Sequence, residues 1–350
     1  MLNKQIIPGI QSFKMFEEFY MKIYIRAEIT EKYREQLKQY FSEIVYDPWT
    51  KNGERFYPDE MAKKMSEINP DVLITELDQI NDKVLAKSSN LKAIVDCRST
   101  PENIDVDAVN KYKIPLIHTP ARNAEAVAEM LVGLIITKQR QIIQANKWVL
   151  NGNWKPGTTP YYIWKGHELY SQTIGFVGFG AVAKTAAKLL ENFGCKMLFY
   201  DPYVESTNTS AKKTDLETLF TNSDIVSLHL PVTSETKGMI DRKYLSLMKK
   251  SSLFVNTSRS AVVNTEDLYD CLAKKQISGG IIDVLDVEPP ENKDDLKLAL
   301  LDNVISTPHI CGSTYEVVLH QSEIAVNSLI NYLKKNYQKA NIINSNVLDG

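Results

Sequence analysis

Three polar residues in the second half of the chain follow short apolar segments and have side chains suited to acid–base chemistry. Arg259 follows SLFVNTS, Glu288 follows GGII, and His309 follows NVISTP. Histidine exchanges a proton near neutral pH, and a nearby carboxylate can orient a protonated imidazole and stabilise it. The planar guanidinium of arginine suits a carboxylate. Because ligands bind at the carboxyl ends of parallel strands, these residues predict a site that moves a proton on an anionic substrate.

His229 is the competing candidate for the base. It is flanked by Leu228 and Leu230 and followed by Pro231, so we interpret it as a wall residue on the cofactor side. Structural roles are favoured for the other histidines, which are His118, His167 and His320. No cluster has the spacing of metal ligands, and no G-x-S-x-G or Cys/His nucleophile pattern is present. We therefore predict no metal site.

A glycine-rich turn lies within the segment 173–201. An apolar run ends at Gly178, the turn G-x-G-x-x-A extends to Ala183, a helical pattern follows, and a second apolar run ends at Asp201. Gly178 allows a sharp turn, Gly180 lets a pyrophosphate approach the backbone, and Ala183 allows close packing of helix on strand. The free N–H groups of the helix would meet the phosphate charge. A tight turn in any α/β protein is the alternative, but the complete order favours a dinucleotide site.

Asp201 lies about 20 residues after Gly180, where an acidic side chain accepts a hydrogen bond from a ribose 2′-hydroxyl. A 2′-phosphate at this point would meet a like charge. The sequence therefore predicts NAD as the cofactor in preference to NADP.

Alternating apolar strands and helical patterns must position these residues. The first half predicts one α/β domain ending near His118, with strands at 21–27, 43–48, 71–77, 91–97 and 115–119. Residues 1–20 precede the first clear strand and are expected to be a helix or a loose arm. We expect one long helix over 124–150, an irregular aromatic-rich segment at 153–169 that wraps the surface, and then six strands in a doubly wound order.

A helical pattern over 314–336 is expected to cross back to the first domain. We predict a discontinuous substrate domain of residues 1–118 and 319–350 and an NAD-binding domain of residues 119–318. A cleft between the two domains is expected to hold the ligands.

The composition of the 350-residue chain is typical of a soluble globular protein, with 43% hydrophobic and 24% charged residues. A net charge of −2 provides no basic surface for nucleic acid or an anionic membrane. No apolar run reaches the roughly 18–20 residues of a membrane span, and no signal peptide is evident. Four widely spaced cysteines indicate reduced thiols. These features predict a cytoplasmic protein.

Several segments together resemble the D-isomer-specific 2-hydroxyacid dehydrogenase family. They are GHELYSQTIGFVGFGAVAK, LHLPVTSET, FVNTSRSAVVNTEDL, GGIIDVLDVEPP and STPHICGST. The segments CRSTPENID and TPARNAEAVAE are similar to a phosphoglycerate-dehydrogenase-like bacterial subgroup. The resemblance implies two doubly wound parallel-sheet domains, a Rossmann NAD-binding domain and a flavodoxin-like substrate domain. It also implies a homodimer built through the cofactor domains, with the long helix after Asn123 contributing to the interface.

The resemblance assigns roles to individual residues. Arg259, Glu288 and His309 would be catalytic. The substrate carboxylate would be held by Arg98, Ser99, Thr100 and Asn123. The residues assigned to the cofactor are Gly178, Phe179, Gly180, Ala181, Val182, Asp201, Pro202, His229, Leu230, Pro231, Thr236, Asn256, Thr257, Ser258, Asp283 and Gly312.

The expected activity is NAD-dependent interconversion of a 2-oxoacid and a D-2-hydroxyacid. Phosphoglycerate dehydrogenase and glyoxylate or hydroxypyruvate reductase are alternatives for the specific activity, and an NAD(H)-sensing binding protein is an alternative of another class. A formate-type enzyme usually pairs its histidine with glutamine, so Glu288 argues against it. The chain departs from the usual family pattern at Ser171, Ser260, Asn264 and Cys311, and Ser260 and Cys311 could narrow the site.

Overall fold

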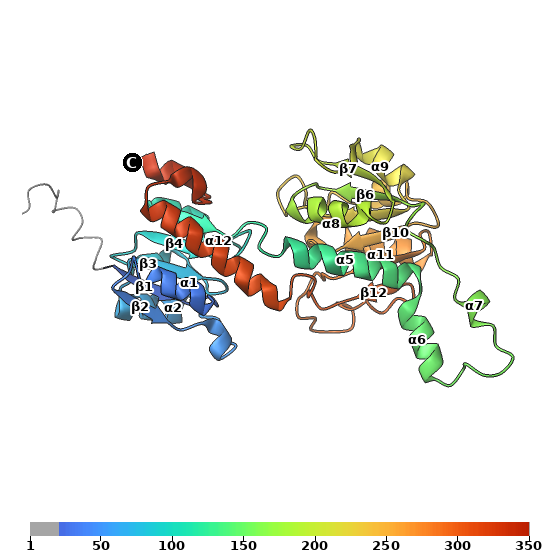
Figure 1. The fold of residues 1–350 in the computed structure, drawn as a ribbon, viewed down its shortest axis with the longest axis horizontal. Helices are drawn as coiled ribbons and strands as arrows, with labels where there is room; N and C mark the ends of the chain where they lie inside the picture. The colour runs from blue at the N-terminus through green and yellow to red at the C-terminus, as the bar shows by residue number, and fades with distance from the viewer. Residues whose placement is uncertain (1–20, 350) are drawn as a thin grey trace, which may run out of the picture. The chain divides into compact units, whose positions relative to one another are not determined.

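The structure is a computed structural model that describes residues 21–349, which form two compact units. The first unit contains the residues up to Arg122 and those from Thr314 onwards, and the second unit is Asn123–Ser313 (Figure 1). The predicted borders, after residues 118 and 318, lie a few residues from these positions. The expectation for residues 1–20 lies outside the described residues.

A five-stranded parallel sheet forms the centre of the first unit. Its strand order is β2-β1-β3-β4-β5, which is the flavodoxin-like order and confirms the predicted fold class. All five predicted strands are present, and they are β1 (Lys22–Ile25), β2 (Glu43–Tyr46), β3 (Val72–Thr75), β4 (Ala93–Asp96) and β5 (Leu116–His118).

Helices cover both faces of this sheet because alternate strand residues point to opposite faces. Ile23 and Ile25 pack with α1 (Glu31–Leu37) and α12 (Tyr315–Leu333). Tyr24 packs on the other face with α2 (Pro58–Ile68), α3 (Asp82–Leu85) and α4 (Val106–Lys111). The chain therefore returns through α12 to complete the first unit. The short 3-10 helices of this unit are η2 (Trp49–Lys51), η4 (Tyr337–Lys339) and η5 (Ser345–Asp349).

A seven-stranded parallel sheet forms the centre of the second unit, in the order β12-β11-β10-β9-β6-β7-β8. The sequence predicted six of these strands and missed β8, because Lys212–Lys213 has no apolar signal. The strands are β6 (Thr173–Val177), β7 (Lys196–Tyr200), β8 (Lys212–Lys213), β9 (Ile225–Leu228), β10 (Leu253–Asn256), β11 (Gly279–Ile282) and β12 (Val304–Ser306).

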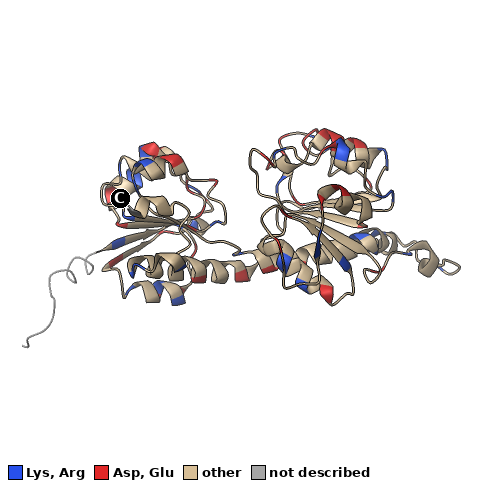
Figure 2. Ribbon diagram, turned by 90° about the horizontal axis from the view of Figure 1, so that it is seen from above, with Lys and Arg blue, Asp and Glu red and all other residues tan. Residues whose placement is uncertain are grey.

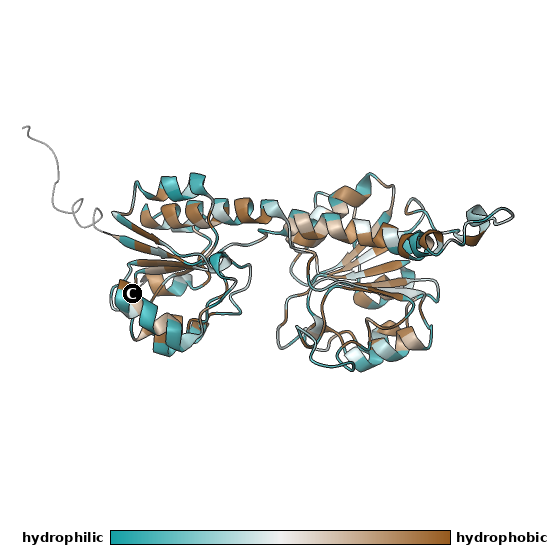
Figure 3. Cartoon of the chain, turned by 90° about the horizontal axis from the view of Figure 1, so that it is seen from below, coloured by the Kyte–Doolittle hydropathy of each residue, from teal (hydrophilic) through white to brown (hydrophobic). Residues whose placement is uncertain are grey.

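Two hydrophobic clusters lie on the two faces of this sheet. One contains residues of α9 (Leu216–Asn222), α10 (Arg242–Leu245) and α11 (Thr265–Ala273). The other contains residues of α5 (Ala124–Gln139) and α8 (Ala181–Glu191). Figure 3 shows the apolar strands between helices whose outer faces are more hydrophilic. A short 3-10 helix, η3 (Ser260–Val262), follows β10.

The prediction of one long helix over 124–150 is wrong. The helix ends at Gln139, and α6 (Ile142–Leu150) begins after Gln141, whose φ is 52°. The returning chain explains the break, because the carbonyl oxygen of Gln139 accepts a hydrogen bond from the N–H of His167 instead of from the next helical turn. A close approach at Gly166 reinforces the break, since a Cβ there would collide with the same carbonyl oxygen.

Residues 140–168 form a projecting segment, which we call the arm. It contains α6, an irregular stretch and α7 (Pro160–Ile163), and it extends away from the body of the second unit (Figure 1). The expectation that residues 153–169 wrap the surface is therefore wrong.

Acidic and basic residues are interspersed on the outer helices of each unit, and the strands carry few of either (Figure 2). Among residues 21–349, no helix combines the length and the apolar character needed to cross a membrane. The same range contains no group of three or more His, Cys, Asp or Glu side chains that could hold a metal ion.

Candidate active site

Strands β10, β11 and β12 bring the predicted catalytic positions to one edge of the second unit's sheet. Asn256 is in register with Ile282 on β11, and Ile282 is in register with Ser306 on β12. Arg259 and His309 each follow these strand ends by three positions. Because parallel strands end at the same edge, the sheet explains why residues far apart in sequence share one site.

His309 and Glu288 form a direct pair at this edge. The Nδ1 atom of His309 lies 2.6 Å from Oε2 of Glu288, and the side chains are 45% and 34% exposed. Oε1 of Glu288 accepts a hydrogen bond from the N–H of Leu285 at 2.7 Å. The carboxylate is thus held by its own loop and orients the imidazole, which leaves Nε2 to face a ligand.

The buried carboxylate of Asp283 fastens the loop that carries His309. Its Oδ1 accepts hydrogen bonds from the Thr307 hydroxyl at 2.5 Å and the Ile310 N–H at 3.0 Å, and its Oδ2 accepts one from the Cys311 N–H at 3.0 Å. Asp283 is 1% exposed. His309 has a φ of 55°, which non-glycine residues rarely adopt and which surrounding contacts must maintain.

This fastening role of Asp283 was missed by sequence reasoning, which assigned the residue only to the cofactor wall. An acidic residue after a fully apolar strand was the available signal, but it does not reveal which N–H groups the carboxylate accepts from.

Arg259 belongs to a tight turn after β10. The Asn256 amide donates to the Arg259 carbonyl oxygen at 2.9 Å, and its Oδ1 accepts from the N–H and hydroxyl of Ser258. Nη1 of Arg259 donates to the Ser258 carbonyl oxygen at 2.8 Å. Thr257 is 9% exposed, and its hydroxyl is buried with no hydrogen-bond partner among residues 21–349. The turn therefore carries the guanidinium of Arg259 and a Thr257 hydroxyl that has no hydrogen-bond partner among residues 21–349.

His229 differs chemically from His309. Burial lowers the pKa of His229 to about 4, so its imidazole is neutral at pH 7. Its Nε2 lies 2.9 Å from the Ser227 hydroxyl, and its ring lies 5.6 Å from that of Phe176. A neutral imidazole cannot supply a proton as an acid near neutral pH, which favours His309 for that role.

The glycine turn has the geometry that a dinucleotide needs. Gly178 has a φ of 87°, and a Cβ there would lie 2.5 Å from the His229 carbonyl oxygen, so no other residue fits. At Gly180, the N-cap of α8, a Cβ would have no atom within 4 Å. Ala183 is fully buried against the sheet. The open space at Gly180 and the first N–H groups of α8, those of Ala181 and Val182, fit a pyrophosphate.

Asp201 is held beside this turn at the end of β7. Its Oδ2 accepts from the Phe179 N–H at 2.8 Å, and its Oδ1 accepts from the N–H groups of Tyr203 and Val204 at 2.8 and 3.0 Å. A carboxylate has about four lone-pair sites, so capacity remains for a ribose hydroxyl. Pro202 is exposed in the following turn.

The remaining cofactor candidates lie in the second unit. Leu230 is 7% exposed, and the Thr236 hydroxyl donates to the Pro231 carbonyl oxygen at 2.6 Å. A Cβ at Gly312 would lie 2.5 Å from Nδ2 of Asn123. The Asn123 side chain therefore packs directly on Gly312.

Three of the predicted substrate residues lie in the first unit, in the loop after β4. Nη2 of Arg98 donates to Oε2 of Glu102 at 2.8 Å. The Ser99 hydroxyl donates to the Thr119 carbonyl oxygen at 3.3 Å, and Ser99 and Thr100 are exposed. The structure thus gathers Arg98, Ser99 and Thr100 at one strand end, while Asn123 belongs to the second unit.

Known proteins share this sequence and fold. Residues 132–311 match the family model described as D-isomer specific 2-hydroxyacid dehydrogenase, NAD binding domain. YoaD of Bacillus subtilis, whose name assigns it to the 2-hydroxyacid dehydrogenases, is 44% identical over 87% of this chain and 88% of its own length. A glyoxylate reductase of Thermofilum pendens is 35% identical over 93% of this chain and 95% of its own length. The structure of a D-lactate dehydrogenase of Aquifex aeolicus, solved with NAD and lactic acid, matches with a TM-score of 0.72 at 27% identity. The match covers 92% of this chain and 98% of that protein.

The two glycines of the turn provide a test of the dinucleotide geometry. Gly180→Val should melt close to the wild type because the protein leaves space for the side chain, yet it should weaken NADH binding by roughly 100-fold or more because that space is needed by the ligand. Gly178→Val should instead destabilise the fold, since it meets both the left-handed φ and the His229 carbonyl oxygen. Thermal melts and NADH fluorescence titrations measure both effects, and wild-type NADH affinity in Gly180→Val would contradict the assignment.

Proposed function

The chain belongs to the D-isomer specific 2-hydroxyacid dehydrogenase family, and from this premise we propose that His309, Glu288 and Arg259 perform its NAD-dependent oxidoreductase reaction. The reaction interconverts a 2-oxoacid and a D-2-hydroxyacid. The observation that carries the proposal is the 2.6 Å contact between Nδ1 of His309 and Oε2 of Glu288, because it creates an oriented acid at the edge of the NAD-binding sheet.

In the direction of reduction, His309 donates the proton from Nε2 to the carbonyl oxygen of the substrate. Glu288 accepts the Nδ1–H and stabilises the imidazolium before the transfer. The guanidinium of Arg259 binds the substrate carboxylate and stabilises the negative charge that develops on the reacting oxygen. NADH, when bound, supplies the hydride that reaches the carbonyl carbon. In oxidation the same groups act in reverse, and His309 takes the hydroxyl proton.

The substrate is proposed at the level of a small 2-oxoacid. Of the two departures that could narrow the site, Cys311 is buried at 2% exposure, whereas Ser260 is half-buried in the turn that follows Arg259. Phosphoglycerate dehydrogenase and glyoxylate or hydroxypyruvate reductase remain the alternatives for the specific activity. The oriented His309–Glu288 pair favours an enzyme over a protein that only senses NAD(H).

We further propose a homodimer in which a second copy of the chain covers the arm. Large apolar side chains on the arm are exposed, namely Leu150 (76%), Trp154 (66%), Tyr161 (81%), Tyr162 (65%) and Ile163 (50%). So many large exposed apolar side chains in one segment are unusual on a monomer. A two-fold dimer would cover the same surface on both copies.

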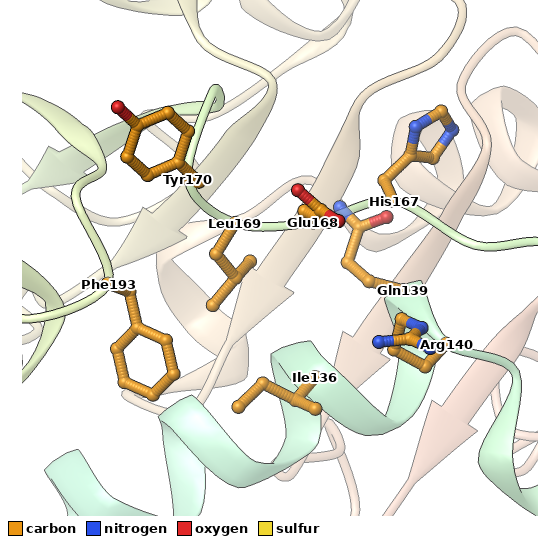
Figure 4. A pocket seen from close by; sticks show the side chains of 8 residues that line it. All are labelled: Ile136, Gln139, Arg140, His167, Glu168, Leu169, Tyr170 and Phe193. Atoms are coloured by element: carbon orange, nitrogen blue, oxygen red, sulfur yellow. The ribbon is translucent and has the colours of Figure 1, made fainter.

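A pocket at the base of the arm supports this proposal. It has a volume of about 300 Å³ and is lined by Ile136, Gln139, Arg140, His167, Glu168, Leu169, Tyr170 and Phe193. Figure 4 shows Tyr170 and Phe193 on one side and Arg140 and His167 on the other. We propose that an aromatic side chain of the second copy enters this pocket, because its lining combines apolar side chains with polar ones as interface pockets do.

We also propose that the protein works in the cytoplasm. All four cysteines are free, and Cys97, Cys271 and Cys311 are buried. Unpaired buried thiols are typical of a reducing compartment.

His309→Ala provides the test of the proposed chemistry. Turnover should fall by roughly 10²–10⁴-fold because the proton donor is lost, while NADH affinity should stay close to the wild type. NADH oxidation is measured with glyoxylate, pyruvate, hydroxypyruvate, phosphohydroxypyruvate, 2-oxoglutarate and branched 2-oxoacids. His320→Ala, on α12 of the first unit, is the matched control and should retain activity.

Unchanged turnover in His309→Ala would contradict its role as the acid. Tight NADH binding by the wild type without turnover of any 2-oxoacid would instead favour the NAD(H)-sensing alternative.

Asp201→Ala should raise the use of NADPH relative to NADH, because it removes the carboxylate that accepts from the ribose and repels a 2′-phosphate. The ratio of kcat/KM for the two cofactors is the measurement. Glu205→Ala, which removes an exposed acid from the same segment, should leave the ratio unchanged. An unaltered ratio in Asp201→Ala would remove the role assigned to this residue.

Leu150→Asp should shift the protein from dimer towards monomer, because it places a charge in the apolar surface that the second copy covers. Light scattering after size-exclusion chromatography gives the mass. Leu300→Asp is the matched control, since Leu300 is 68% exposed in the same unit but lies outside the arm. A wild-type monomer, or equal effects of the two substitutions, would refute the proposed interface.

A further inference from the structure

The last residue of β4, Asp96, is a fully buried acid with no evident function in the proposed reaction. It is 0% exposed, and neither carboxyl oxygen has a hydrogen-bond partner among residues 21–349. We propose that Asp96 is a positioning residue, uncharged when the 98–100 loop binds the substrate carboxylate, and that its ionisation weakens this binding. The inference rests on the proposed function and extends it to the pH dependence of substrate affinity.

The backbone beside Asp96 leads directly into that loop and is pinned on both sides. The Cys97 N–H donates to the Thr75 carbonyl oxygen at 2.7 Å, and the Arg98 carbonyl oxygen accepts from the Thr119 N–H at 3.0 Å. The Ser99 carbonyl oxygen lies 2.8 Å from Nδ1 of His118. These contacts fix the backbone on both sides of the Asp96 side chain, so the geometry of the 98–100 loop is set at this strand end.

The cations that face Asp96 already have other partners. Arg98 donates to Glu102 at 2.8 Å. Arg122 donates to Glu76 at 2.9 Å and to the Gln321 side chain. Neither guanidinium forms a hydrogen bond with Asp96, so an ionised Asp96 would be a buried charge without a salt-bridge partner, which is costly.

Two other titratable groups lie beside Asp96, and neither neutralises it. Glu76 is 9% exposed and also accepts from Nε1 of Trp49 at 2.9 Å, so it contributes a second acidic group. Burial raises the pKa of the Cys97 thiol well above its ordinary value, so that thiol stays uncharged.

The Asn103 side chain is the remaining polar group beside Asp96. The neighbouring Asn103 donates from Nδ2 to the Asp78 carbonyl oxygen at 3.0 Å, and its Oδ1 is buried without a partner within 21–349. A carboxylate only accepts, whereas a carboxylic acid has an O–H to donate. Burial raises the pKa of Asp96 to about 8. The charges of Arg98 and Arg122 and a side-chain interaction with Asn103 act to lower this pKa, but Asn103 does not reach good hydrogen-bond geometry with either carboxyl oxygen.

Loss of this proton has two consequences for the loop. The new charge attracts Arg98 and Arg122 away from Glu102 and Glu76, which disturbs the loop geometry. It also repels a substrate carboxylate held by the backbone after Asp96. Both effects lower substrate affinity above pH 8 and leave NADH affinity, which depends on the second unit, unchanged.

Oxamate binding to the full-length NADH complex tests the proposal, because oxamate carries the carboxylate of a 2-oxoacid but is not reduced. Asp96→Asn mimics the uncharged acid at all pH values. The ratio of the oxamate dissociation constants, wild type over Asp96→Asn, should be near one at pH 7 and should rise roughly tenfold by pH 9.5. The contribution of every other group of the site to oxamate binding is the same in both proteins and cancels in this ratio.

Asp105→Asn is the matched control. Asp105 is an exposed acid of the same unit that caps α4 through the Ala108 N–H, a role that asparagine also fills. The ratio of the oxamate dissociation constants, wild type over Asp105→Asn, should not change with pH. A flat ratio for Asp96→Asn as well would overturn the proposal.

Unfolding experiments without substrate test the charge state independently. The folded pKa of about 8 exceeds the ordinary value of 3.8, so between about pH 4 and pH 8 the folded chain keeps a proton that the unfolded chain releases. The free energy of unfolding of the wild type therefore falls as pH rises through this range. The unfolding midpoint of Asp96→Asn should therefore exceed that of the wild type by more at pH 8 than at pH 5. A constant difference would overturn the uncharged state of Asp96.

Two further measurements separate the possible failures. If Asp96→Asn does not fold, Asp96→Ser replaces it, because serine is also uncharged and can donate a hydrogen bond. In the wild type, the infrared carbonyl band of a protonated carboxyl group should be present at pH 7 and lost above pH 9. Its absence at pH 7 would refute the proposal. A wild type that neither binds oxamate nor reduces any 2-oxoacid would refute the proposed function, whereas the unfolding comparison would still decide the charge state of Asp96.

Discussion

The buried carboxylate of Asp283 is the constraint on which the position of the His309 loop depends. Three donors from residues 307–311 converge on it, and the loop between them holds His309 at a φ of 55°. Such a backbone conformation persists only when its surroundings over-determine it. The 2.6 Å contact with Glu288 then sets the direction of the imidazole. The acid–base pair is therefore a consequence of a buried hydrogen-bond network and not of two mobile surface residues meeting by chance.

Three acids near strand ends show how surroundings give one residue type different roles. Asp201 accepts three backbone N–H groups beside the glycine turn. Asp283 is buried but has three donors of its own. Asp96 is equally buried and has no donor in good hydrogen-bond geometry among residues 21–349, and burial raises its pKa to about 8. The count of donors, more than burial alone, separates a fastening carboxylate from an uncharged acid.

The second unit combines a seven-stranded sheet with a projecting arm, and close packing at Gly166 explains where the arm begins. The chain returning at Gly166 occupies the end of α5, so the Gln139 carbonyl oxygen accepts from His167. The helical pattern resumes in α6 with its apolar residues exposed. A sheet edge that carries Arg259, Glu288 and His309 and an arm with exposed apolar side chains thus belong to one folded unit.

Local sequence by itself determined the glycine turn, the acid at Asp201, the order of most strands and the candidates Arg259, Glu288 and His309, because each follows from short-range periodicity or from residue type at a strand end. Tertiary structure alone decided the break between α5 and α6, the existence of β8, the fastening role of Asp283 and the uncharged state of Asp96. Each of these depends on which groups distant in sequence are brought into contact or removed from water. A helical sequence pattern does not reveal where an N–H group from a distant segment will donate to a carbonyl oxygen of the helix. The position of an acid in the sequence does not reveal which donors will reach its carboxyl group.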